Sequence, residues 1–134
     1  MKRLLYFIAV LILISSCNRS EQFEITGTIQ NGEEKTIVLS ELLVSGTKEI
    51  KSVELNKKGN FKIKSEADIP KFYQLSISKT NFVTLIIEPG EQITIQGNAK
   101  DMSKSKIMGS EGSKLAQKIN NQFAATKHKL DSIA

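Results

Sequence analysis

The fold class is clearest in residues 23–32, which read Phe23-Glu24-Ile25-Thr26-Gly27-Thr28-Ile29-Gln30-Asn31-Gly32. They alternate apolar and polar side chains and then end in a turn. Their apolar members share one face, and Glu24 and the threonines share the other, which is typical of a half-buried β-strand. The Asn31-Gly32 pair is a turn signal because both residues tolerate a positive φ angle. The stretch therefore predicts a protein made of strands joined by tight turns.

The same two-residue period recurs along most of the chain after this stretch. We predict strands at residues 23–29, 36–43, 50–55, 61–63, 73–77, 81–87 and 93–95. In the strand 81–87, apolar side chains occur at both odd and even positions, which point to opposite faces, so we expect both faces to be covered. Turns are predicted at Ser45-Gly46, Asn56–Gly59 and Pro89-Gly90. Strands in hairpin succession predict a mainly β fold, namely an antiparallel β-sandwich or partly open barrel of about seven strands.

The period changes after Gly109, where apolar residues begin to recur every three or four positions. A single amphipathic helix face would carry Leu115, Ile119, Phe123, Thr126, Leu130 and Ile133. Either Ser110 or Ser113 is expected to cap this helix. We expect the helix to pack across an opening or an edge of the β-domain, or to dock a partner. The expected partner-binding face consists of Leu115, Ile119, Phe123 and Leu130.

The first seventeen residues have the shape of a bacterial lipoprotein signal peptide. A basic start is followed by an apolar run, Leu4 to Ile14, and then by Ile14-Ser15-Ser16-Cys17. At about 1.5 Å per residue the run spans roughly 17 Å, which is shorter than the ~30 Å hydrocarbon core of a bilayer. We therefore expect cleavage before Cys17 and lipid on its thiol, with Ile14, Ser15 and Ser16 as the cleavage box. An ordinary signal peptide and an uncleaved anchor are the alternatives.

The predicted organisation has four parts, which differ in composition and period. Residues 1–16 form a signal peptide, 17–22 a lipidated tether, 23–110 an antiparallel β-domain and 111–134 a C-terminal helix. The expected partners are the membrane, reached through lipidated Cys17, and an envelope protein. We expect the outer membrane, with the domain facing the periplasm, because Asn18 is not the Asp linked to inner-membrane retention in some Gram-negative bacteria.

The composition argues against several classes of function. The 134 residues carry a net charge of +5, but the lysines are spread along the chain without an arginine and aromatic stripe, so nucleic acid is not an expected partner. The only histidine, His128, lies between two lysines, so we expect no metal site. Glu33-Glu34 and the Glu88/Glu91 pair lie at turns and do not suggest a general-acid pair. No cofactor is expected, and no enzymatic activity.

A set of short motifs resembles a known family. The motifs are Phe23-x-Ile25-x-Gly27-x-Ile29, Gly59-x-Phe61-x-Ile63, Pro70-x-x-Tyr73-x-Leu75, Pro89-Gly90-x-x-Ile93-x-Ile95-x-Gly97 and Ile107-x-Gly109-Ser110. In their order they resemble the small all-β domain of unknown function that precedes the thioredoxin-like domain in TlpA-type thiol–disulfide oxidoreductase lipoproteins of Bacteroidota. The resemblance covers roughly residues 23–133.

This resemblance implies a fold and a cellular address but not the family's chemistry. In those proteins the redox reaction belongs to a following domain with a Cys-x-x-Cys pair, and Cys17 is the only cysteine here. We expect a lipid-anchored cell-envelope protein whose non-catalytic β-domain is a binding or spacer module. The alternative is a truncated or split thiol–disulfide oxidoreductase that lacks its redox domain. A third hypothesis, a small-ligand carrier, requires an apolar cavity.

Overall fold

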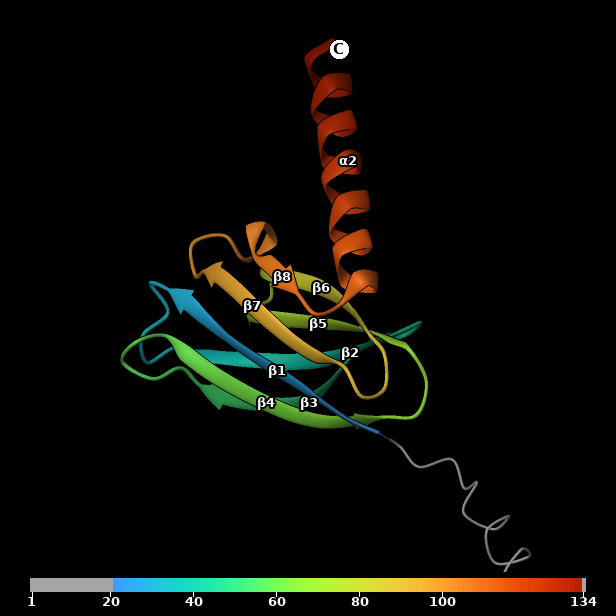
Figure 1. The fold of residues 1–134 in the computed structure, drawn as a ribbon. Helices are drawn as coiled ribbons and strands as arrows, with labels where there is room; N and C mark the ends of the chain where they lie inside the picture. The colour runs from blue at the N-terminus through green and yellow to red at the C-terminus, as the bar shows by residue number, and fades with distance from the viewer. Residues whose placement is uncertain (1–20, 134) are drawn as a thin grey trace, which may run out of the picture.

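The computed structural model describes residues 21–133, and they form a two-sheet β-sandwich with one long helix (Figure 1). The predicted fold class is confirmed, with eight strands instead of about seven. The elements in chain order are β1 (Glu21–Gln30), β2 (Thr36–Leu43), β3 (Gly46–Glu54), β4 (Asn60–Ala67), β5 (Lys71–Ser78), β6 (Asn81–Ile87), β7 (Gln92–Asn98), the 3₁₀ helix η2 (Met102–Lys104), β8 (Lys106–Met108) and α2 (Glu111–Ile133).

Each sheet has four strands, and the core lies between the two inner faces. One sheet has the order β4-β1-β7-β8 and the other has the order β3-β2-β5-β6. The side chains that alternate inward along the strands are buried, including Phe23, Ile25, Leu75, Leu85 and Ile95. The rings of Phe23 and Tyr73 join the two sheets, with centroids 5.4 Å apart. The predicted alternation therefore identifies the core correctly.

The predicted hairpin succession is wrong at the first turn. Asn31 does have a positive φ of 59°, but the chain turns there from one sheet into the other instead of closing a hairpin. β1 pairs antiparallel with β4 and parallel with β7, with Ile25 opposite both Ile63 and Ile93. The parallel pair departs from the all-antiparallel expectation. A turn signal shows where the chain reverses, whereas strand pairing depends on contacts between residues that are far apart in the sequence.

The turn before β4 shows the same separation of local and long-range structure. The predicted turn at Asn56–Gly59 is present, since Gly59 has a positive φ of 76° and its N–H donates to the Asn56 carbonyl at 2.8 Å. β3 and β4 nevertheless lie in different sheets. β4 pairs with β1 instead of β3, and Lys62 of β4 contacts Glu24 of β1 at 3.6 Å.

The first described strand begins earlier than the sequence pattern predicts. Glu21 and Gln22 pair with Ala67 and Glu66, so these last two residues of the predicted tether belong to β1. The predicted signal peptide, its cleavage box and Cys17 lie outside the described residues. Within residues 21–133, no helix is both long enough and apolar enough to cross a membrane.

Candidate functional site

Two buried serines attach the start of α2 to the edge of β6. Ser110 is the N-cap, because its hydroxyl oxygen accepts from the Ser113 N–H at 3.2 Å. The Ser113 hydroxyl oxygen accepts from the Ile86 N–H at 3.0 Å, and both serine hydroxyls lie 2.9 Å from the Ile86 carbonyl oxygen. The side chains thus satisfy backbone groups that an edge strand would otherwise leave open.

Beyond its first turns, α2 leaves the sandwich and projects from it (Figure 1). The side chain of Gln117 makes the next attachment, donating to the carbonyls of Ser103 and Ser105 at 3.2 and 2.5 Å. The expectation that the helix packs across an edge is confirmed for its start and is wrong for the remainder. The physical reason is that the helix face directed at the domain is polar. The apolar stripe of α2, which consists of Leu115, Ile119, Phe123, Thr126, Leu130 and Ile133, therefore has no sheet beneath it.

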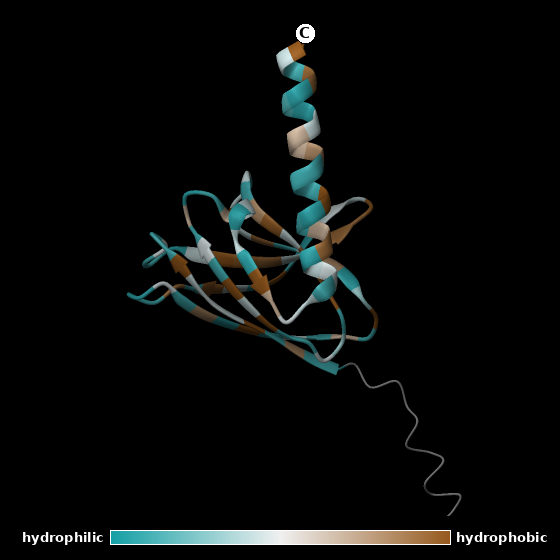
Figure 2. Ribbon diagram, turned by 45° about the horizontal axis from the view of Figure 1, so that its top comes forward, coloured by the Kyte–Doolittle hydropathy of each residue, from teal (hydrophilic) through white to brown (hydrophobic). Residues whose placement is uncertain are grey.

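The predicted partner-binding face is exposed on this projecting helix. Leu115, Ile119, Phe123 and Leu130 are 57, 42, 73 and 63% exposed, and Figure 2 shows apolar segments at intervals along α2 where it stands clear of the sheets. An amphipathic helix gains most of its stability by burying such a stripe. The exposure is therefore consistent with a docking face, and the docking itself stays a prediction.

The stripe has the spacing of a coiled-coil seam. From Ile119 to Ile133, the members are separated by four, three, four and three residues, which averages to the 3.5-residue period of helices that wrap around one another. Lys127 and Lys129 lie beside the seam, and the nearest acidic residue of the helix, Asp131, lies on another side of it. A partner helix with acidic flanks would complement this face.

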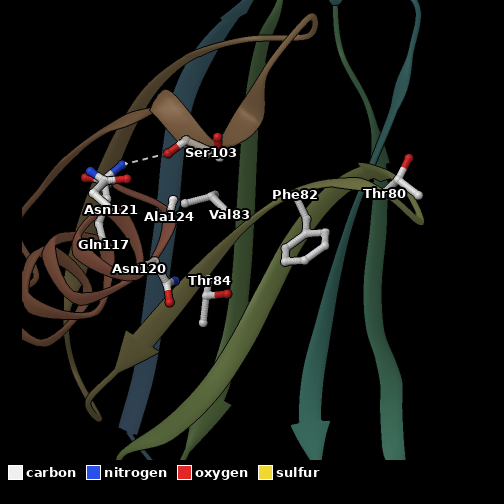
Figure 3. Close-up of a pocket in the computed structure, with 9 residues that line it drawn as sticks. All are labelled: Thr80, Phe82, Val83, Thr84, Ser103, Gln117, Asn120, Asn121 and Ala124. Carbon is white, nitrogen blue, oxygen red and sulfur yellow. Dashed lines mark hydrogen bonds between the residues drawn. The ribbon is translucent and has the colours of Figure 1, made fainter. Parts of the chain in front are cut away.

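A groove of about 290 Å³ lies between β6 and α2 (Figure 3). Its lining is Thr80, Phe82, Val83, Thr84, Ser103, Gln117, Asn120, Asn121 and Ala124. None of these residues is charged, and most carry a hydroxyl or a carboxamide. Figure 3 places Thr84 on the strand wall and Asn120 on the helix wall that faces it. The groove therefore suits a neutral ligand that both donates and accepts hydrogen bonds.

The ionisable groups of residues 21–133 do not gather into a metal-binding cluster. No group of three or more His, Cys, Asp or Glu side chains gathers in this part of the chain. Hydrogen bonding to Glu41 raises the pKa of Lys71, and burial raises the pKa of Tyr73. A hydrogen bond from Ser103 lowers the pKa of Asp101, which caps η2. Each shift has a local structural cause.

Sequence patterns predicted the helix face but not the groove. The sequence pattern of β6 pointed away from a groove, because both alternating sets of its side chains are apolar and predict a strand covered on both faces. That prediction is only partly correct, because Val83, Leu85 and Ile87 are buried, whereas Phe82 on the other face is 38% exposed. Gly112 of α2 covers Ile86, and the rest of that face is open.

Comparison with known protein families matches residues 23–118 to the family described as a domain of unknown function (DUF4369). The match spans most of the 134 residues, so the chain belongs to this family. The matched region ends at Lys118, so it includes the serine-anchored start of α2 and leaves out most of the exposed stripe. Neither the curated proteins nor the solved structures gave a match.

Proposed function

We propose that this family member is a lipid-anchored, non-catalytic binding module of the bacterial cell envelope. The exposed apolar stripe of α2 is the observation that carries the proposal. A projecting helix that leaves large apolar side chains in water has a stripe available for a partner. The spacing of the stripe and the lysines beside it favour a helical partner with acidic flanks.

The N-terminal residues support the membrane anchor in this proposal. Ile14, Ser15, Ser16 and Cys17 have the order of a lipoprotein cleavage box behind a basic start and a short apolar run. β1 begins at Glu21, so a chain lipidated at Cys17 holds the sandwich within a few residues of the bilayer. We propose that the domain faces the periplasm from the outer membrane and presents α2 to another envelope protein.

Replacing Cys17 with serine is expected to abolish attachment to the membrane. The serine hydroxyl cannot take the thioether-linked lipid, and two or more acyl chains are needed for stable anchoring. The measurement is fractionation of cells, together with the mass of the N-terminal peptide. The matched control is Ser20→Ala, which leaves the cleavage box intact and should remain in the membrane fraction. Membrane attachment of the Cys17→Ser protein, with an unmodified N-terminal peptide, would refute the lipid anchor.

A photoreactive p-benzoylphenylalanine placed at Phe123 is expected to crosslink to a second envelope protein in cells. The matched control position is His128, which lies roughly 140° around the helix from Phe123 and is also exposed. Phe123→Ser should change the free energy of unfolding by less than about 0.5 kcal/mol, because the ring lies outside the core. Equal crosslinking from both positions, or crosslinks only to lipid or to a second copy of this chain, would contradict the proposed docking face.

A further inference from the structure

The β6 edge differs from the other three sheet edges in its lack of charge. Edge strands are commonly protected from pairing with other chains by charged side chains. β3 carries Lys48, Glu49, Lys51 and Glu54, β4 carries Lys62, Lys64 and Glu66, and β8 carries Lys106. β6 reads NFVTLII and has no charged residue. It is therefore the edge with the least side-chain protection against an added strand.

Backbone groups of β6 are open along the groove. In an antiparallel strand, every second residue directs its N–H and C=O away from the neighbouring strand. Ile86 is one of these residues, since Ser113 and Ser110 bind its outward groups. Thr84 and Phe82 have the same parity, and no hydrogen bond between residues 21–133 satisfies their outward groups. At the N-terminal end of β6, the side-chain carboxamide of Asn81 donates to the Ala99 carbonyl and accepts from the Met102 N–H.

The opposite wall of the groove offers a second row of hydrogen-bonding groups. Asn120 and Asn121 of α2 line it, and each carboxamide provides both donors and an acceptor, as a peptide bond does. A strand placed in the groove would have the β6 backbone along one side and these carboxamides along the other. α2 therefore lies where a second whole sheet would have to approach β6, so a single added strand is the occupant that we consider.

We infer that the groove between β6 and α2 binds a short, uncharged, extended peptide segment of another protein by strand addition to Phe82–Thr84. The absence of charge on all the lining residues matches a neutral segment. The open run is short, since Ser113 closes one end and the loop around Asn81 closes the other. Two outward residues provide up to four backbone hydrogen bonds, which is the main source of affinity in strand addition.

The test titrates the full-length protein in mild detergent with the peptide Ac-Thr-Val-Ser-Val-Thr-NH₂ and follows the backbone amides by NMR. We expect saturable shifts at Phe82 and Thr84. The matched probe is the same peptide with both valine nitrogens methylated, which removes backbone donors and keeps the side chains. It should bind at least about tenfold more weakly, as expected for the loss of two hydrogen bonds.

Two variants of Thr84 separate the backbone from the side chain. Thr84→Pro removes the outward N–H at an edge position where proline is tolerated, and we expect it to abolish the shifts. Thr84→Val keeps the N–H and should preserve them. If Thr84→Pro does not fold, the methylated probe still decides the outcome. The inference would be overturned if the two peptides bound equally, if the shifts appeared only on other sheet edges, or if no binding was seen at millimolar peptide. It would also be overturned if the same shifts appeared without peptide at high protein concentration.

Discussion

Replacing Gly27 with alanine is expected to lower the free energy of unfolding by about 3 kcal/mol, at the upper end of the usual cost of overpacking. A Cβ atom at this position would lie 2.1 Å from the Ile95 carbonyl oxygen and 3.0 Å from the Phe61 ring. The carbonyl belongs to the backbone of β7, so it cannot move aside as a flexible side chain can. Relief requires displacement of β1 from β7. The measurement is chemical denaturation of the two proteins.

The matched control for this prediction is Thr26→Ala on the same strand. Thr26 points to the other side of the sheet from the core, and its loss should cost less than about 1 kcal/mol, which is the span of strand propensities. The comparison separates the steric contact from a general weakening of β1. Equal stability of the Gly27→Ala variant and the parent protein would mean that β1 and β7 do not pair in the register that places Gly27 opposite Ile95.

Gly27 also shows how far the sequence predicts this fold. Its place in an alternating stretch predicts a strand, and a glycine inside a strand points to a close approach of another backbone. The sequence does not show which backbone approaches, because β7 lies about seventy residues further along the chain. Local periods and turn residues therefore predict the core, the long helix and every described strand except the short β8. The pairing of β1 with β4 and β7 depends on long-range packing.

The two parts of the candidate site differ in the same way. The spacing of Leu115, Ile119, Phe123 and Leu130 identifies a helix face from local sequence alone. The exposure of this face depends on where α2 leaves the sandwich. That point is fixed by the hydrogen bonds of Ser110 and Ser113 to Ile86, which the spacing of apolar residues does not show. The groove was not predictable, because the status of β6 as an edge strand follows from the strand order of the sheet.

Replacing Ser113 with alanine is expected to destabilise the protein by about 2 kcal/mol, the cost of leaving a buried donor unpaired. Ser113 is fully buried, and its hydroxyl oxygen accepts from the Ile86 N–H at 3.0 Å. Alanine fits the space but offers no acceptor. Chemical denaturation measures the loss, and hydrogen exchange at the Ile86 amide should become faster. The control is Ser132→Ala, because Ser132 is exposed near the end of the helix and should contribute less than about 0.5 kcal/mol.

The same serines provide a test of whether the helix start and the β6 edge act as one unit. The hydroxyls of Ser110 and Ser113 lie 2.8 Å apart and share the Ile86 carbonyl. Ser110→Ala alone should cost about 1 kcal/mol through loss of the cap, and the double variant should cost less than the sum because the partners are shared. Strictly additive losses would show that the two serines act independently. A Ser113→Ala protein as stable as the parent would show that this network does not hold α2 to β6, and the projecting direction of the helix would then need another cause.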